Sequence, residues 1–203
     1  MGTWVGCAIS MFQQLSGINA IMFYSSAIFA SSNSSLSPNA QTALVQAVAI
    51  VSSTMSIGML NFKGRKFLLT FWTSMCAVFM YLMALAVIKG WGNFELVMVM
   101  LFMACFQFAP GPIVWLYNGE ILKDKGYSAA VTTNWLFTLV IALITPSMIG
   151  WSAAGSFLFF GTCNALGVVS FLLFMKETMG LTDMQVKYLY RKDRDVIKEF
   201  EGQ

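Results

Sequence analysis

The side chains best able to bind a ligand are uncharged amides set in an apolar segment near the start of the chain. At about 100° per residue, Gln13, Ser16 and Asn19 share roughly 120° of one helix face, and Gln14 lies beside them. Amides carry both donors and acceptors, which suits a neutral polyhydroxylated solute better than an ion. The same amides could instead only bond to neighbouring helices, and spacing alone leaves the two interpretations open. Gly17, between them, would let the backbone bend or approach a ligand closely.

A second group of polar and aromatic residues surrounds the interruption of a later apolar segment at Pro110, Gly111 and Pro112. Proline removes a backbone donor and leaves a carbonyl four residues earlier without its partner, so we expect the helix to break or pivot here. Trp115 follows the break and has a ring face that could stack on the apolar face of a sugar. Asn134 adds an amide in the next apolar segment.

The composition limits the class of protein. Of the 203 residues, 58% are hydrophobic and 10% are charged, and the mean hydropathy is +0.70. A soluble domain would have about a quarter of its residues charged, and a net charge of +3 is too small for a typical nucleic-acid binder. The chain has no His, and its four cysteines show neither paired nor metal-type spacing. We therefore expect an integral membrane protein that is not an enzyme, with no cofactor, no metal site and no nucleic-acid partner.

The elements that must position these residues are long apolar segments. Each crossing of a bilayer takes about 20 apolar residues, so six crossings fit in this length. We expect an all-α six-helix bundle over 1–175 and a charged, partly helical tail over 176–203. In the tail, Met184, Tyr188, Arg191 and Asp195 have helical spacing. The six expected spans cover residues 3–30, 40–60, 67–88, 96–119, 128–149 and 157–175.

The order of the spans and the basic residues predict how the bundle lies in the membrane. Interrupted helices head both the first and the second group of three spans, as expected for two inverted three-helix repeats. Six spans place both termini on one side, and that side holds every Lys and Arg except Lys89. The positive-inside rule then puts both termini in the cytoplasm, or in the matrix if the membrane is the mitochondrial inner one. The sequence does not choose between these membranes.

Five motifs, in order and nearly in register, resemble the sugar porters of the major facilitator superfamily, the glucose-transporter-like group. The resemblance implies that the chain is the C-terminal six-helix half of such a porter. The motifs are Gln13-Gln14-Leu15-Ser16-Gly17-Ile18-Asn19 in the seventh helix, Gly64-Arg65-Lys66 in the loop after the eighth, Pro110-Gly111-Pro112 with Trp115 and Glu120 in the tenth, Asn134-Trp135 in the eleventh, and Glu177-Thr178-Met179-Gly180-Leu181-Thr182 after the twelfth.

The resemblance also implies roles for individual residues. Those expected to line a central hexose site are Gln13, Gln14, Asn19, Trp115 and Asn134.

A second set is expected to belong to a network at the cytoplasmic end that gates alternating access. Its members are Gly64, Arg65, Lys66, Glu120 and Glu177. Such a network, together with hinges at Gly17 and at residues 110–112, is what a transporter-type bundle requires.

The sequence departs from the family pattern where polar or charged residues are usual. Ala49 replaces a sugar-contacting asparagine, Gln107 replaces a glutamate, and Asn61 and Phe62 replace an acidic residue and an arginine. Two functions remain open. The chain could transport a hexose by alternating access once a second six-helix bundle completes it, or it could be a non-transporting accessory subunit, buried in lipid among other membrane subunits of a large complex. The mitochondrial inner membrane is one candidate location for such a complex.

Overall fold

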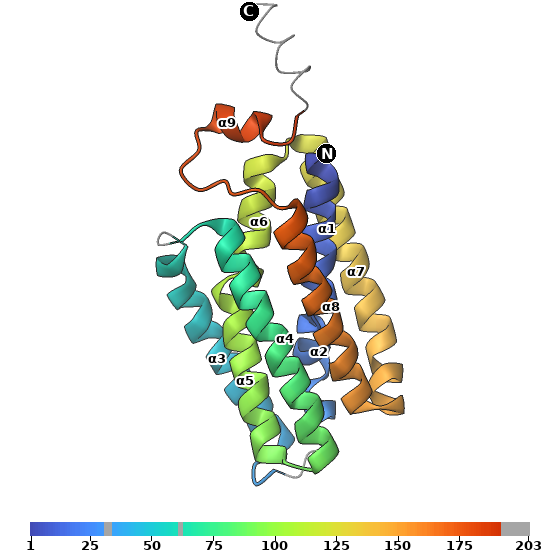
Figure 1. Cartoon of the computed structure of the whole chain (residues 1–203). Coiled ribbons are helices and arrows are strands. Elements are labelled where there is room, and N and C mark those ends of the chain that lie inside the picture. The colour runs from blue at the N-terminus through green and yellow to red at the C-terminus, as the bar shows by residue number, and fades with distance from the viewer. Residues whose placement is uncertain (31–33, 61–62, 192–203) are drawn as a thin grey trace, which may run out of the picture.

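The computed structural model describes residues 1–30, 34–60 and 63–191, and these residues form a bundle of long helices (Figure 1). The helices in the described part of the chain are α1 (Gly2–Leu15), α2 (Ile18–Ala30), α3 (Pro38–Met59), α4 (Arg65–Lys89), α5 (Gly92–Phe108), α6 (Pro110–Ile121), α7 (Asp124–Trp151), α8 (Ala153–Phe174) and α9 (Asp183–Tyr188).

Five segments of the described chain are long and apolar enough to cross a membrane. They are α3, α4, α7, α8 and the combined stretch of α5 and α6. The first expected span, 3–30, is interrupted near Gly17, as the sequence predicts. It is divided into α1 and α2, of 14 and 13 residues, which follow one another along the bundle in Figure 1. The predicted interruption of the fourth span is confirmed, because α5 ends at Phe108 and α6 begins at Pro110.

Several helix ends follow from local chemistry. The Ser37 hydroxyl accepts a hydrogen bond from the backbone N–H of Ala40, and Pro38 occupies the first turn of α3, where its missing N–H costs nothing. Gly90 ends α4 in the left-handed conformation, with a φ of 68°. Ser152 caps α8 as Ser37 caps α3.

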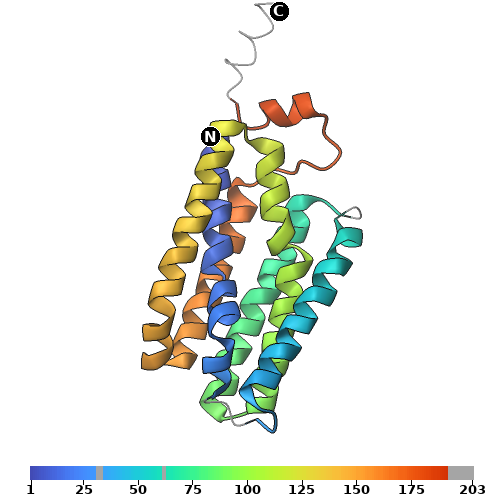
Figure 2. The same ribbon diagram turned by 180° about the vertical axis from the view of Figure 1, so that it is seen from behind.

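The helices pack so that one side of the bundle remains uncovered by this chain. The main packing partners are α4 with α8 and α5, α7 with α1, and α3 with α5. In their most apolar stretches, only 22% of the residues of α3 and of α7 are buried, against 39% for α4 and for α8 and 56% for α5 and α6 together. Figure 2 shows the bundle from the side on which α3 and α7 lie apart, with α1, α2, α5 and α6 between them.

The N-terminus and α9 lie at the same end of the bundle, as the sequence predicts for an even number of crossings (Figure 1). The ends of α3 and α6 reach this end too, whereas the turn between α4 and α5 lies at the opposite end. The short helix α9 lies within the expected tail and ends at Tyr188, before Arg191. Asp195, the last residue of the expected tail helix, lies outside the described residues.

Candidate functional site

The amides predicted to bind a ligand form one hydrogen-bonded chain between α1, α2 and α7. Gln14 Nε2 donates to Asn134 Oδ1 at 2.7 Å, and Asn134 Nδ2 donates to Gln13 Oε1 at 2.7 Å. Asn19 Nδ2 donates to Gln14 Oε1. Gln13, Gln14 and Asn134 are buried, while Asn19 is partly exposed. The structure therefore assembles four of the five predicted ligand residues into a single polar cluster.

The break between α1 and α2 is what allows this cluster to form. In an uninterrupted helix Gln14 and Asn19 would point about 140° apart. Instead, Gly17 adopts a φ of +89°, which is unfavourable for L-residues, and a new helix, α2, begins at Ile18. The predicted stripe of Gln13, Ser16 and Asn19 does not form, because the Ser16 hydroxyl bonds to the backbone of its own turn.

Gln13 connects the break in the first span to the break in the fourth. Its Nε2 donates to the carbonyls of Pro110 at 2.9 Å and Gly111 at 3.0 Å, at the start of α6. Both amide hydrogens are thereby used, and the side-chain oxygen accepts from Asn134. Gln13 thus holds two interrupted helices together, in addition to lining the cleft described next.

All five predicted ligand residues line one cleft with a volume of about 470 Å³. Ligand pockets for small molecules commonly enclose about 300–1,000 Å³. Trp115 and Trp135 contribute aromatic rings, and Gln107 contributes a further amide. None of the described residues that line the cleft carries a formal charge; the others are Ile18, Met22, Phe23, Ser53, Phe106, Gly111, Pro112 and Thr138. The cleft therefore offers hydrogen bonds and ring faces without an ionic partner.

The departures from the family pattern fall in different places. Ala49 is buried in the apolar core, so this position contributes apolar packing where an asparagine would contribute an amide. Gln107 lines the cleft as a neutral amide. Asn61 and Phe62 lie outside the described residues.

Several polar residues that were not among the predicted site residues support the helices around the cluster. Asn118 Nδ2 donates to Ser10 Oγ at 2.9 Å, and Thr138 Oγ1 donates to the Asn134 carbonyl at 3.0 Å. Asn164 on α8 donates to the carbonyl of Ser16 at 3.0 Å. Each is a polar side chain within an apolar segment, a signal that could have identified it.

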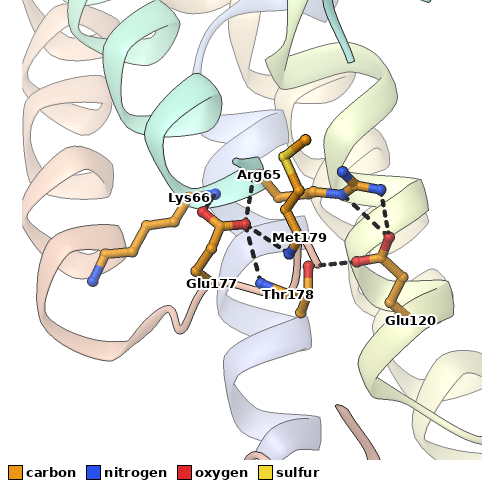
Figure 3. A network of polar contacts seen from close by, with 6 residues as sticks. All are labelled: Arg65, Lys66, Glu120, Glu177, Thr178 and Met179. Carbon is orange, nitrogen blue, oxygen red and sulfur yellow. Dashed lines mark hydrogen bonds and ion pairs between the residues drawn. The ribbon is translucent and has the colours of Figure 1, made fainter. Parts of the chain in front are cut away.

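The residues predicted to form the gate also come together, at the end of the bundle that carries the N-terminus (Figure 1), and Figure 3 shows the polar contacts of Arg65, Lys66, Glu120 and Glu177. The Glu177 carboxylate accepts from the backbone N–H groups of Arg65 at 2.7 Å and Lys66 at 3.1 Å. These are the first residues of α4, so Glu177 caps that helix and complements its dipole. A β-carbon at Gly64 would overlap the Glu177 carboxylate, so any side chain there would displace the carboxylate from this position.

Glu120 on α6 joins the same network. Arg65 donates from Nε and Nη2 to Glu120 Oε1 at 3.2 and 3.1 Å, and the Thr178 hydroxyl donates to Glu120 Oε2. Figure 3 shows the two carboxylates on either side of Arg65 and Thr178. Lys66 Nζ donates to the carbonyl of Leu172 in the last turns of α8, at 2.9 Å. The network therefore ties α4, α6, α8 and the segment after α8 to one another.

Hydrogen bonds of two tyrosines, Tyr117 on α6 and Tyr190 in the tail, hold the start of the tail against α6. The Tyr117 hydroxyl donates to the Lys176 carbonyl at 2.7 Å and lies 2.6 Å from the Tyr190 hydroxyl. The backbone N–H of Lys176 donates to Tyr190 at 2.9 Å. Burial raises the pKa of Tyr190, so its neutral form is favoured in this contact.

Comparison with known proteins identifies the family. The family model described as Sugar (and other) transporter matches residues 2–190. Sugar transporter ERD6-like 6 of Arabidopsis thaliana is 32% identical over 92% of this chain and 42% of its own length. Facilitated trehalose transporter Tret1 of Apis mellifera ligustica is 31% identical over 87% of this chain and 38% of its own length. The chain belongs to the sugar transporter family, and its named relatives are transporters rather than enzymes.

Solved structures agree with this assignment. A double tryptophan mutant of XylE superposes with a TM-score of 0.85 at 25% identity, covering 93% of this chain and 42% of that one. The inward-open xylose transporter XylE from E. coli has a TM-score of 0.83 at 24% identity, with the same coverage. The fold is that of one six-helix half of a major facilitator transporter, in an integral, multi-pass membrane protein. The chain spans about two fifths of the length of these relatives.

Proposed function

We propose that the chain provides half of a sugar-translocation pathway. In this proposal a second six-helix bundle completes the cleft, and the pair moves a hexose across the membrane by alternating access. The observation that carries the proposal is the convergence of Gln13, Gln14, Asn19, Trp115 and Asn134 on one cleft without a charged lining residue.

The hydrogen-bonding capacity left in the cleft suits a sugar. Gln14 uses one N–H on Asn134, so its second N–H remains for a ligand hydroxyl. Asn19 is partly exposed, and no hydrogen bond within the described chain engages its Oδ1. Trp115 adds a ring on which the apolar face of a sugar can stack. Amides and an indole recognise hydroxyl groups and C–H faces without requiring an ionised ligand.

The exposed helices support a second bundle as partner. The cleft lies between α3 and α7, to which Ser53 and Trp135 belong. Both helices carry large apolar side chains that are more than half exposed, among them Val51, Leu139 and Leu143. Polar groups within a bilayer need a partner or water, so a cleft lined by amides is disfavoured against lipid alone. We further propose, from the basic residues, that both termini face the cytoplasm or the matrix.

The proposed gate would work through the network around Glu177 and Glu120. Its bonds join α6, which follows the break at Pro110, to α4 and to the segment after α8. A change of angle at the break would then be transmitted to the end of the bundle. Gly17, Pro110, Gly111 and Pro112 are the proposed hinge residues.

Uptake of labelled D-glucose into proteoliposomes tests this function. The protein is extracted in mild detergent with whatever subunit accompanies it, and reconstituted. We expect unlabelled glucose to inhibit this uptake by competition. Uptake should be lost in the Gln14→Ala variant and should persist in the Gln41→Ala variant. Gln41 is the matched control, because it is a buried glutamine that bonds to Leu36 outside the cleft. Recovery among unrelated subunits, with no uptake, would instead support the non-transporting accessory subunit.

A further inference from the structure

Asn164 is a buried amide on a helix that does not line the cleft. It lies in the middle of α8, where 1% of its surface is exposed. A polar side chain at this depth is costly unless it has a partner. Its Nδ2 donates to the Phe160 carbonyl one turn earlier at 2.8 Å and to the Ser16 carbonyl at 3.0 Å. The second bond crosses from α8 to the break between α1 and α2.

The Ser16 carbonyl is one of the groups that the break leaves without a helical partner. The last carbonyls of a helix have no intrahelical donor, and inside a membrane no bulk water replaces it. Ser16 directly follows α1, and the next residue, Gly17, has the φ of +89° that turns the chain. Asn164 therefore donates at the point where the direction of the first span changes.

Two glycines let α8 approach its neighbours closely on either side of Asn164, Gly167 toward α1 and Gly161 toward α4. A β-carbon at Gly167 would lie 3.3 Å from the ring of Phe12 on α1, and one at Gly161 would lie 3.1 Å from the ring of Tyr81 on α4. They lie on either side of Asn164, about one turn away. The break also packs closely against α8, since a β-carbon at Gly17 would lie 2.7 Å from the Phe160 ring. The bond from Asn164 is thus held in place by close packing on both sides.

We propose that Asn164 is a positioning residue for the ligand cleft. By bonding to the Ser16 carbonyl it holds the break in the geometry that brings Asn19 to Gln14, although it hydrogen-bonds to neither side chain in the described structure and does not line the cleft. The part of this inference that concerns ligand affinity rests on the proposed sugar-binding function. The part that concerns the geometry of the break does not.

A double-mutant cycle on D-glucose affinity tests the first part, with affinity followed by tryptophan fluorescence of the reconstituted protein. Loss of one hydrogen bond corresponds to a loss of about 3–10-fold in affinity, which we expect for Asn164→Leu. If Asn164 acts through Asn19, the double variant with Asn19→Ala will bind no more weakly than Asn19→Ala alone. Multiplication of the two losses would overturn the proposal. Ser156→Ala is the control, because Ser156 is buried in α8 but bonds only within that helix.

Amide hydrogen exchange tests the second part without a ligand. In Asn164→Leu we expect faster exchange in the peptide covering residues 13–20, and unchanged exchange there in Ser156→Ala. Asn164→Ala provides the same comparison if the leucine variant does not fold. Unchanged exchange in the substituted protein overturns the proposal. If the wild-type protein binds no glucose while exchange responds as expected, the proposed function fails and the positioning role stands.

Discussion

Replacing Glu177 by glutamine tests whether the capped start of α4 stabilises the bundle. The Glu177 carboxylate accepts four backbone N–H groups, from Arg65, Lys66, Thr178 and Met179. Its Oε1 accepts three of them and its Oε2 accepts that of Lys66. A glutamine can keep the three bonds to one oxygen, but its NH₂ group must then face the Lys66 N–H.

The expected cost follows from these contacts. A partly buried donor left without an acceptor costs about 1–3 kcal/mol. Loss of the negative charge at the start of a helix adds about 0.3–1 kcal/mol. Because Glu177 is only partly buried, we take the lower part of these ranges and expect about 2 kcal/mol. For a chain of this length this corresponds to a decrease of roughly 4–8 °C in the unfolding temperature.

Thermal unfolding in detergent, followed by intrinsic fluorescence, measures this decrease. Asp124→Asn is the matched control, because Asp124 is an exposed acid in the first turn of α7 and caps no backbone group in the described structure. It should cost less than about 1 kcal/mol, the contribution of the helix dipole alone. Equal unfolding temperatures for Glu177→Gln and the wild type, or equal decreases for the two variants, would refute the role assigned to the backbone bonds.

Two further predictions concern the breaks in the helices. Gln13→Ala removes both bonds to the carbonyls at the start of α6, so we expect a loss of about 1–2 kcal/mol in unfolding free energy even without sugar; an unchanged unfolding temperature would contradict this. Gly17→Ala places a β-carbon 2.7 and 2.9 Å from two buried side chains at a φ of +89°, and should cost at least about 2 kcal/mol. Gly58→Ala, in α3 with no atom near the added carbon, should instead stabilise by up to about 1 kcal/mol, and the same thermal assay compares the two.

The sequence predicted which residues gather at the candidate site better than it predicted how their side chains are arranged there. All five predicted ligand residues line one cleft, and the five predicted gate residues meet at one end of the bundle. Their ligand and gating roles stay predictions. The predicted interruption of the first span at Gly17 is confirmed, but the shared face of Gln13, Ser16 and Asn19 was wrong. Helical spacing assumes an unbroken rotation of about 100° per residue, which fails where the positive φ of Gly17 interrupts the helix.

The tertiary structure was also needed to distinguish neighbouring amides. Gln13 and Gln14 are adjacent and chemically identical, yet both N–H groups of Gln13 bond to backbone carbonyls of α6, whereas Gln14 bonds to Asn134 and Asn19. Nothing in the local sequence separates them. The distinction comes from which helix packs against each side of α1.

By itself, the sequence determined that the chain is a helical, multi-pass membrane protein, because long apolar segments depend on composition and order alone. It also indicated the two breaks, since glycine and proline act locally on the backbone. Only the tertiary structure decided which polar groups satisfy one another, as Asn164 does for Ser16 and Glu177 for the start of α4. Those partners lie more than a hundred residues apart in the sequence, and only the packing of whole helices brings them within hydrogen-bonding distance.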